Sequence, residues 1–319
     1  MTLACIAVFG EVLLDEFPDG AVIGGAPYNV ARALACFGAD PLMITRTGQD
    51  DFAALIRQDM RDADMRCQGV QSDKQWPTGR VLVGLDANDP LTHTFEIVRN
   101  QAYDQIDGDD ARRQFESYLE QRGCRSQQAI LYFGTLALRQ LTSRSALRSL
   151  LSDNMALRYL DLNLRQQEVG EQVIREAIAA ADILKINEDE LQILLTMYPV
   201  SETIHSAKDS ESSPSDHLLT AMLYRLELKA LIVTLGAEGY AYADQQGNIL
   251  RGKPAQAVDV ADTVGAGDAF SAVFLLGLLK QWPTEITLRR AQDFAGAICQ
   301  VRGAAGPRSL YKEWLQAWQ

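Results

Sequence analysis

The sequence has no surplus of basic residues and no long apolar run. Of its 319 residues, 30 are Lys or Arg and 42 are Asp or Glu, so its formal net charge is −12. Proteins that bind nucleic acid or anionic membranes need a basic surface, and this charge balance argues against both classes. No stretch of about 18 apolar residues occurs, so we expect no membrane span. An anionic ligand would have to be held locally, by backbone N–H groups, a helix N-terminus or a metal.

Cysteine is also sparse and scattered. The sequence has five cysteines, at Cys5, Cys36, Cys67, Cys124 and Cys299. No two of them form a CxxC pair. We therefore expect buried free thiols in a reducing compartment, and neither a disulfide framework nor a zinc site. The first residues, MTLACIAVFGE, lack a basic segment, and their apolar run is too short for a secretion signal. They predict a buried first strand, and both features favour a cytoplasmic protein.

Short apolar segments alternate with segments of helical spacing along most of the chain, in which 47% of the residues are hydrophobic. Buried strands are predicted at 3–10, 41–46, 129–133, 157–161, 182–186 and 230–235. Helices are predicted between them at 27–37, 50–64, 142–154, 170–180, 187–197 and 215–227. The alternation indicates βαβ units, and so a mostly parallel sheet with helices on both faces.

Three regions break this rhythm. Residues 11–22 and 77–98 have alternating apolar residues with no helix between the strands, which predicts a small separate sheet attached to the main one. Residues 198–217 are polar and Ser-rich, as is typical of a surface loop. Residues 266–302 predict two consecutive helices, the second of them started by Pro283.

The stretch DTVGAGDAF at 262–270 places a glycine-rich turn and an acid before an apolar helix. It is not GxxxxGK, because no Lys follows, and it is not GxGxxG, because Phe270 holds the last position. Asp268 can accept the proton of an attacking hydroxyl, although helix capping alone also explains an acid there. Unpaired N–H groups at the start of the helix can stabilise a phosphoryl group in transfer, and they belong to Gly265, Ala266 and Gly267.

A second stretch, GGAPYNVARALACFG at 24–38, also joins a glycine turn to a helix. Pro27 can open that helix, and Asn29 lies in its first turn. A turn followed by a proline-started helix is one explanation. The functional explanation is that Gly24 and Gly25 let sugar hydroxyls contact the backbone, while Asn29 donates side-chain hydrogen bonds.

Together the two stretches resemble the signatures of the ribokinase/PfkB family of sugar kinases. GGAPYNVA, followed by Gly38 and Gly48, resembles the N-terminal signature, and DTVGAGDAF resembles the C-terminal one. The resemblance covers essentially the whole chain. It implies a single domain over 1–319, with a ribokinase-like three-layer α/β/α fold, a mostly parallel central sheet, and a small β-sheet lid over the sugar.

The resemblance implies roles for the residues of both stretches. Asp268 would be the catalytic base, and Gly265, Ala266 and Gly267 would form the anion hole. Asp15, in GEVLLD, aligns with the family's sugar-binding aspartate, and a carboxylate there suits a neutral polyol because it accepts two hydroxyl donors. The remaining sugar contacts implied are Gly24, Gly25 and Asn29.

Other segments resemble the family's nucleotide and metal motifs. In KINEDEL, at 185–191, Asn187 and Glu190 would organise Mg²⁺ largely through its waters. The same pair is a capping box, and both roles can hold. In DLNLR, at 161–165, Arg165 would face the phosphates or the substrate, or else form a surface salt bridge.

TLGAEG, at 234–239, resembles the family's nucleotide edge. Thr234, Gly236 and Gly239 would line the ATP site together with Asn187 and Gly267, although a strand ending in a glycine hairpin also explains the pattern. Asp262 and Thr263 would position the catalytic loop. In many relatives the residue at the position of Asp262 contacts a monovalent cation, which leaves open whether K⁺ is required here.

The function that the resemblance favours is ATP-dependent phosphorylation of a sugar hydroxyl. GEVLLDEFPDG, DLNLR and QAYDQI look most like bacterial fructokinases, and Leu13 stands where ribokinases usually have Asn. Fructose is therefore the first candidate, followed by ribose, 2-keto-3-deoxygluconate and nucleosides. Arg80 and Arg99, on the expected lid strands, would supply the basic pocket that a sugar phosphate needs.

Two other classes of protein fit the sequence less well than a kinase. A sugar or nucleotide sensor without turnover would be expected to have lost part of the 265–268 loop, which is intact here. A dinucleotide-binding domain is disfavoured, because no GxGxxG follows the first strand. The open edges of the lid predict a homodimer through it. Val273, and the length of the loop at 198–217, depart from the family's pattern without touching the implied chemistry.

Overall fold

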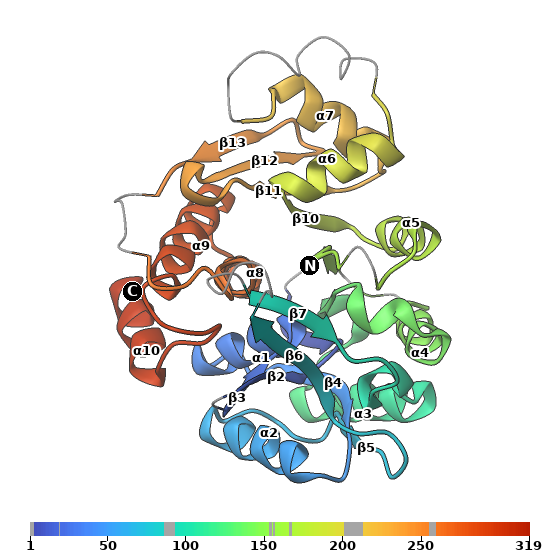
Figure 1. The fold of residues 1–319 in the computed structure, drawn as a ribbon. Coiled ribbons are helices and arrows are strands. Elements are labelled where there is room, and N and C mark those ends of the chain that lie inside the picture. The colour runs from blue at the N-terminus through green and yellow to red at the C-terminus, as the bar shows by residue number, and fades with distance from the viewer. Residues whose placement is uncertain are drawn as a thin grey trace.

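A computed structural model describes residues 3–18, 20–85, 93–152, 155, 157–165, 168–200, 213–254 and 260–319. Its main feature is a nine-stranded sheet with helices on both sides (Figure 1). In spatial order the strands are β13 (Ile249–Gly252), β12 (Tyr240–Asp244), β11 (Ala230–Thr234), β10 (Ile183–Asn187), β9 (Leu157–Asp161), β8 (Ala129–Phe133), β1 (Cys5–Phe9), β4 (Leu42–Thr47) and β5 (Val70–Ser72).

The sheet is parallel from β5 to β11, and β12 is antiparallel to both of its neighbours. This confirms the mostly parallel sheet and each of the strands predicted for it. The alternation of side chains along β1 shows how the sheet divides the core: Cys5, Ala7 and Phe9 point into one hydrophobic cluster, while Ile6 and Val8 point into the other. Strands that are buried on both faces need the continuous apolar runs that the sequence has.

Two groups of helices cover the two faces. One hydrophobic cluster packs against α1 (Ala26–Cys36), α2 (Asp51–Asp62), α8 (Ala266–Lys280), α9 (Thr284–Ile298) and α10 (Arg308–Ala317). The other packs against α3 (Gly108–Arg122), α4 (Leu141–Leu151), α5 (Glu171–Ala179), α6 (Glu188–Met197) and α7 (Asp216–Arg225). Short 3₁₀ helices lie at η1 (Ala102–Gln105), η2 (Ser126–Gln128), η3 (Leu136–Arg139) and η4 (Gly236–Glu238). In the described part of the chain, no helix is both long and apolar enough to cross a bilayer.

A second, four-stranded sheet carries the predicted lid strands. Its order is β3 (Gly20–Gly24), β2 (Leu13–Phe17), β6 (Gly79–Leu85) and β7 (His93–Ile97). Strands β2 and β6 are parallel, and the outer pairs are antiparallel. The small separate sheet is therefore confirmed. The turn expected in DANDP, and most of the loop expected at 198–217, lie outside the described residues.

Helix α8 is central to the half of the molecule that carries the stretch DTVGAGDAF. It packs between α1 and α9, and its residues are apolar on all sides, as expected of a helix surrounded by protein. Val273, which departs from the family's preference for small residues, is fully buried there. The helix begins after Gly265, whose φ of 82° lies in the left-handed region. A Cβ at this position would lie 2.5 Å from the backbone of Ala304, so no larger residue fits.

The expectation of free thiols throughout is wrong for two of the five cysteines. Cys5, at the start of β1, and Cys124 are joined by a disulfide, although 119 positions separate them. Gly123 ends α3 in the left-handed conformation, with φ of 63°, and this turn brings Cys124 back toward the sheet. The other cysteines are free. The bond removes the argument for a reducing compartment that rested on free thiols.

Candidate active site

The two signature stretches meet where α1 and α8 begin. Asn29, in the first turn of α1, donates a hydrogen bond of 2.8 Å from its Nδ2 to Oδ2 of Asp268, in the first turn of α8. Two helix N-termini therefore converge on one place, and each contributes partial positive charge and unpaired N–H groups. The arrangement suits an anion that arrives beside the carboxylate.

Asp268 is held in an environment that makes it a stronger base than an exposed aspartate. Burial raises its pKa to about 6, and the charge of Asp161 adds to the rise. The hydrogen bond from Asn29 and the charges of Lys185 and Arg165 lower it. A carboxylate with a pKa near 6 is still ionised at neutral pH, and it accepts a proton more readily than one with an ordinary pKa.

Of the three residues predicted to form the anion hole, Gly265 is the N-cap of α8, and Ala266 and Gly267 are its first two residues. Gly267 and Asp268 occupy the second and third positions of α8, where N–H groups have no acceptor within the helix. The N–H of Ala266, in contrast, donates to the carbonyl of Thr263 at 3.3 Å. An incoming phosphate would compete with that bond, so Gly267 and Asp268 are the better-placed donors.

The lid contributes a carboxylate with space made for it. Asp15 of β2 pairs with Val22 of β3. A Cβ on Gly24 would lie 2.9 Å from Oδ2 of Asp15, so glycine at this position leaves room for the carboxylate. Burial raises the pKa of Asp15, and the charge of Arg165 lowers it. Gly25, the residue that caps α1, has φ of 105°, and a Cβ there would meet the carbonyl of Glu11 at 2.9 Å.

Arg165 lies close enough to the site for its charge to act on both Asp15 and Asp268. Its side chain is exposed and makes no ion pair within the part of the chain that the structure describes. The alternative of a surface salt bridge is thus not observed. The backbone just before it is fixed, because the N–H of Leu164 donates to Glu190 at 2.7 Å.

The capping box at the start of α6 is confirmed. The N–H of Glu190 donates to Oδ1 of Asn187, and the N–H of Asn187 donates to Oε2 of Glu190, both at 2.8 Å. Each oxygen of Glu190 therefore already accepts a backbone N–H, since the other one holds Leu164. Carboxylate and amide oxygens suit Mg²⁺, and this pair fits an ion held through its waters better than one bound directly.

The expected nucleotide edge is a strand that ends in a glycine turn. Thr234 pairs with Asn187 across β11 and β10, which brings these two predicted residues together at the carboxyl edge of the sheet. Thr234 also donates its hydroxyl to the carbonyl of Ile186 at 3.2 Å. Gly236 and Gly239 both have positive φ, at 55° and 99°. Their conformation explains the glycines, and the nucleotide role of this edge stays a prediction.

Asp262 positions the catalytic loop as expected. Its two oxygens accept from the N–H groups of Val264 and Gly303, each at 3.0 Å. These bonds tie the segment before α8 to the segment that follows α9. A contact from Asp262 to a monovalent cation stays a prediction.

Two charged residues of the site were missed by the sequence analysis. Lys185, buried in β10, donates to the two oxygens of Asp161 at 3.0 and 3.2 Å, and Ser271 of α8 donates to the same carboxylate at 2.8 Å. A Cβ at Gly267 would lie 2.8 Å from Nζ of Lys185. The ammonium group is therefore next to the anion hole. A lysine within the apolar run DILKI was the signal, because buried lysines are rare unless they are paired.

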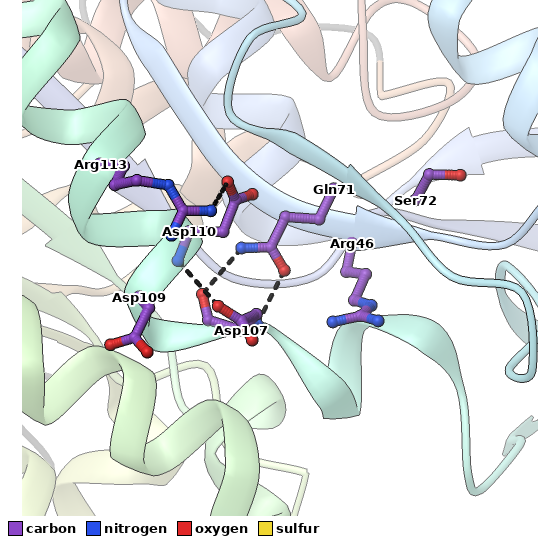
Figure 2. A pocket seen from close by; sticks show the side chains of 7 residues that line it. All are labelled: Arg46, Gln71, Ser72, Asp107, Asp109, Asp110 and Arg113. Atoms are coloured by element: carbon purple, nitrogen blue, oxygen red, sulfur yellow. Dashed lines mark hydrogen bonds and ion pairs between the residues drawn. The ribbon is translucent and has the colours of Figure 1, made fainter.

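A pocket of about 360 Å³ lies elsewhere, between β5 and the start of α3 (Figure 2). Gln71 of β5 donates to the carbonyl of Asp107 at 2.8 Å and accepts from its N–H at 2.7 Å, and Arg113 pairs with Asp110. None of its lining residues belongs to the predicted site, and several of its polar groups already pair with each other. The candidate active site is therefore the place where the two signature stretches meet, and not this pocket.

The fold and the site together define an enzyme of the ribokinase-like class, a kinase that acts on sugars. The chain belongs to the pfkB family of carbohydrate kinases, whose model matches residues 19–309.

Named relatives agree with this family. The chain is 27% identical over 331 residues to fructokinase-2 of Zea mays, covering 95% of this chain and 90% of the relative. It is 29% identical over 331 residues to fructokinase-1 of Oryza sativa subsp. japonica, covering 95% and 93%.

Solved structures of low sequence identity share the fold. A fructokinase with bound ATP from Xylella fastidiosa matches with a TM-score of 0.79 at 20% identity, covering 99% of both chains. Aminoimidazole riboside kinase from Salmonella enterica, solved with aminoimidazole riboside and an ATP analogue, matches with a TM-score of 0.73 at 22% identity, covering 97% and 99%. A double mutant of the Vibrio cholerae fructokinase, with fructose, ADP and potassium ion bound, matches with a TM-score of 0.76 at 22% identity, covering 98% and 99%.

Proposed function

We propose that this sugar kinase transfers the γ-phosphoryl group of ATP to a primary hydroxyl of a neutral sugar, and that fructose is its substrate. The observation that carries the proposal is the position of Asp268, bonded to Asn29 where two helix N-termini converge. A base in that place can serve a hydroxyl, and the helix ends can serve a phosphate. The fructokinases among the relatives support fructose over the other sugars.

The acceptor sugar would lie between the lid and the start of α1. Asp15 would accept hydrogen bonds from two sugar hydroxyls, and the backbone at Gly24 and Gly25 leaves space for close contact. Closure of the lid would exclude water, so that the phosphoryl group reaches the sugar instead of being hydrolysed.

The oxygen of the sugar hydroxyl would bond to the γ-phosphorus of ATP while the bond from that phosphorus to the β,γ-bridging oxygen breaks. Asp268 would take the proton that the hydroxyl gives up. In a loose transition state the proton can leave late, so a base of pKa about 6 is sufficient. The N–H groups of Gly267 and Asp268 would stabilise the charge on the transferring group, and Lys185 adds a cation beside them. Mg²⁺, when bound to the nucleotide phosphates, neutralises their charge, and Asn187 and Glu190 would hold its waters.

A neutral acceptor is favoured over a sugar phosphate. Nη1 of Arg80 lies 3.6 Å from Oε2 of Glu16, and Nε of Arg99 lies 3.9 Å from Oε2 of Glu168. Both arginines therefore have acidic partners. Neither supplies the unpaired basic pocket that a phosphorylated sugar needs. The carboxylate of Asp15 would also repel such a substrate.

We also propose that the protein forms a homodimer through the lid, in the cytoplasm. Leu82 and Phe95, on the central and outer strands β6 and β7, are 40% and 62% exposed, which leaves apolar surface on this small sheet. Size-exclusion chromatography with light scattering tests this assembly, and a monomeric mass at micromolar concentration would contradict it. A requirement for K⁺ is tested separately, by measuring the kinase activity with K⁺ and again with Na⁺ in its place.

A coupled assay of ADP release over a panel of sugars tests the activity. The panel contains fructose, ribose, 2-keto-3-deoxygluconate, a nucleoside and a fructose phosphate. We expect release with fructose and its loss in Asp268→Asn. Tight ATP binding without release for any sugar would instead favour the sugar or nucleotide sensor.

A further inference from the structure

Glu11 is a buried acid for which the fold supplies no full set of partners. It lies in the short connection between β1 of the large sheet and β2 of the lid, and it is only 4% exposed. Among the described residues, no donor reaches its Oε2, although this atom is shielded from water. A buried carboxylate oxygen without a hydrogen bond costs free energy, so an acid at this place calls for an explanation.

The surroundings of Glu11 are those of the acceptor site. Its carbonyl would be 2.9 Å from a Cβ on Gly25, so its backbone touches the residue that caps α1. The charges of Arg165 and Asp268 both act on its carboxyl group. Arg139 also acts on it, but that guanidinium is already paired with Asp104 and Glu168, at 2.8 and 2.7 Å.

Burial makes the carboxyl group of Glu11 reluctant to ionise. Its pKa is raised to about 7, because desolvation outweighs a hydrogen bond from its own backbone N–H and the charges of Arg165 and Arg139. The hydroxyls of Tyr103 and Tyr132 are buried near it and also have no partner among the described residues. Buried polar atoms without a partner in the described part of the chain therefore lie around Glu11 in both hydrophobic clusters.

We propose that Glu11 contacts the acceptor sugar. Its Oε2 accepts a hydrogen bond from a hydroxyl other than the one that is phosphorylated, and its carboxyl group, with that of Asp15, restricts the acceptor to uncharged polyols. This inference rests on the proposed sugar kinase activity and names the substrate class of the same site. Glu11 is then a specificity-determining residue in the connection between the large sheet and the lid.

The chemistry explains why a carboxyl group is placed there. A sugar hydroxyl is a hydrogen-bond donor. When the sugar binds, this hydroxyl would supply the hydrogen bond that Oε2 of Glu11 lacks in the free protein. An anionic acceptor, such as an aldonate or a sugar phosphate, would bring a further negative charge beside the carboxyl groups of Glu11, Asp15 and Asp268. Its charge would therefore weaken the binding of such an acceptor.

The test compares Glu11→Gln and Glu11→Ala with the matched control Glu16→Gln. Glu16 follows Asp15 on the lid strand β2, and its side chain is only partly buried, beside Arg80. We expect Glu11→Ala to raise KM for the sugar by about 10-fold, the size of one lost hydrogen bond. Glu11→Gln keeps an acceptor oxygen and should raise this KM less. KM for ATP should stay within about twofold of the wild type, a margin that is small beside one lost hydrogen bond. Glu11→Gln should also lower the ratio of kcat/KM for neutral sugars to kcat/KM for anionic sugars.

Direct measurements separate the outcomes. Calorimetric titration of sugar without ATP gives the affinity in each variant, and circular dichroism shows that the variant is folded. Unchanged sugar affinity in folded Glu11→Gln and Glu11→Ala would overturn the inference and leave Glu11 with buried water as its partner. A changed KM for ATP with an unchanged KM for sugar would overturn it too, because Glu11 would then act through Arg165. If the wild-type protein neither binds nor phosphorylates any polyol of the panel, the proposed function itself fails along with this inference.

Discussion

The side-chain amide of Asn29 donates a 2.8 Å hydrogen bond to the carboxylate of Asp268, across 239 positions of the sequence. This bond joins the two signature stretches into one site. It fixes the orientation of the proposed base, and it favours the ionised form of that base. Asn29 therefore has a positioning role in addition to any contact with the sugar.

Asp268→Asn should remove most of the activity while making the protein more stable. Loss of a general base lowers kcat on the order of 10²- to 10⁴-fold. The folded-state pKa of about 6 lies above the ordinary value of 3.8, so the folded state carries a cost for the charged form. That cost is fully present above about pH 6 and vanishes below about pH 4.

Thermal unfolding of the two proteins across pH measures this difference. At pH 7.5 the variant should be more stable by roughly 3 kcal/mol, and at pH 3.5 the two should unfold alike. A variant that is less stable than the wild type at pH 7.5 would contradict the burial of a costly charge at this position.

The activity should fall on the acid side with an apparent pKa near 6. Asp268 works only when it is ionised, so kcat/KM should decline tenfold per pH unit below that value. Asn29→Ala should raise the pKa of Asp268 and so shift the acid side of the profile to higher pH, because the hydrogen bond that favours the carboxylate is lost. The profile of kcat/KM between pH 4.5 and 9 gives both values, and an unshifted limb in Asn29→Ala would argue against the observed bond.

Lys185→Met should destabilise the protein much more than a surface lysine does. It would leave the carboxylate of Asp161 buried beside Ser271 without its cation, a change that costs about 3–5 kcal/mol. Lys229 is a matched control, since it also pairs with an aspartate at 3.0 Å but is exposed. Lys229→Met should cost less than about 1 kcal/mol. Urea unfolding compares the two, and equal losses would contradict the buried network.

Gly267→Ala should reduce turnover with little change in stability. The added Cβ would lie 2.8 Å from Nζ of Lys185, so the ammonium has to move away from the anion hole. We expect kcat to fall by about tenfold or more, the size of one weakened electrostatic contact. Gly170→Ala is the control, because nothing lies within 4 Å of its Cβ and its φ is −74°. Equal kcat in the two variants would show that Lys185 adjusts without consequence.

Periodicity predicted the elements whose residues are buried on a regular pattern. The central strands have continuous apolar runs because both of their faces are covered, and the sequence shows this directly. Periodicity missed α3, whose many charged residues leave a weak apolar stripe, and α10, which packs by its tryptophans. It also missed β12 and β13, since this antiparallel pair lies at an edge where the apolar pattern is interrupted.

The site was predicted where local chemistry marks it and missed where only packing does. Glycines and acids at helix starts pointed to Asp268 and Asn29, and the structure brings these together. The pairing of Cys5 with Cys124 and that of Lys185 with Asp161 depend on which strands become neighbours, and spacing along one sequence does not contain this information. Glu11 lies in the same GEVLLD stretch as Asp15, but its deep burial is recorded by no motif.

The order of the strands sets when the enzyme can begin to work during its own synthesis. β1 is synthesised first but lies inside the sheet, between β4 and β8. Its hydrogen bonds to β8 can form only after residues 129–133 have been translated. The lid strands and the sugar side are encoded early, while the base arrives on α8 almost at the end. Because α8 also packs against α1 and α9, a chain released before that helix would lack both the proposed base and much of one hydrophobic cluster. Neither folding of that face nor phosphoryl transfer is therefore expected before the last helices have been made.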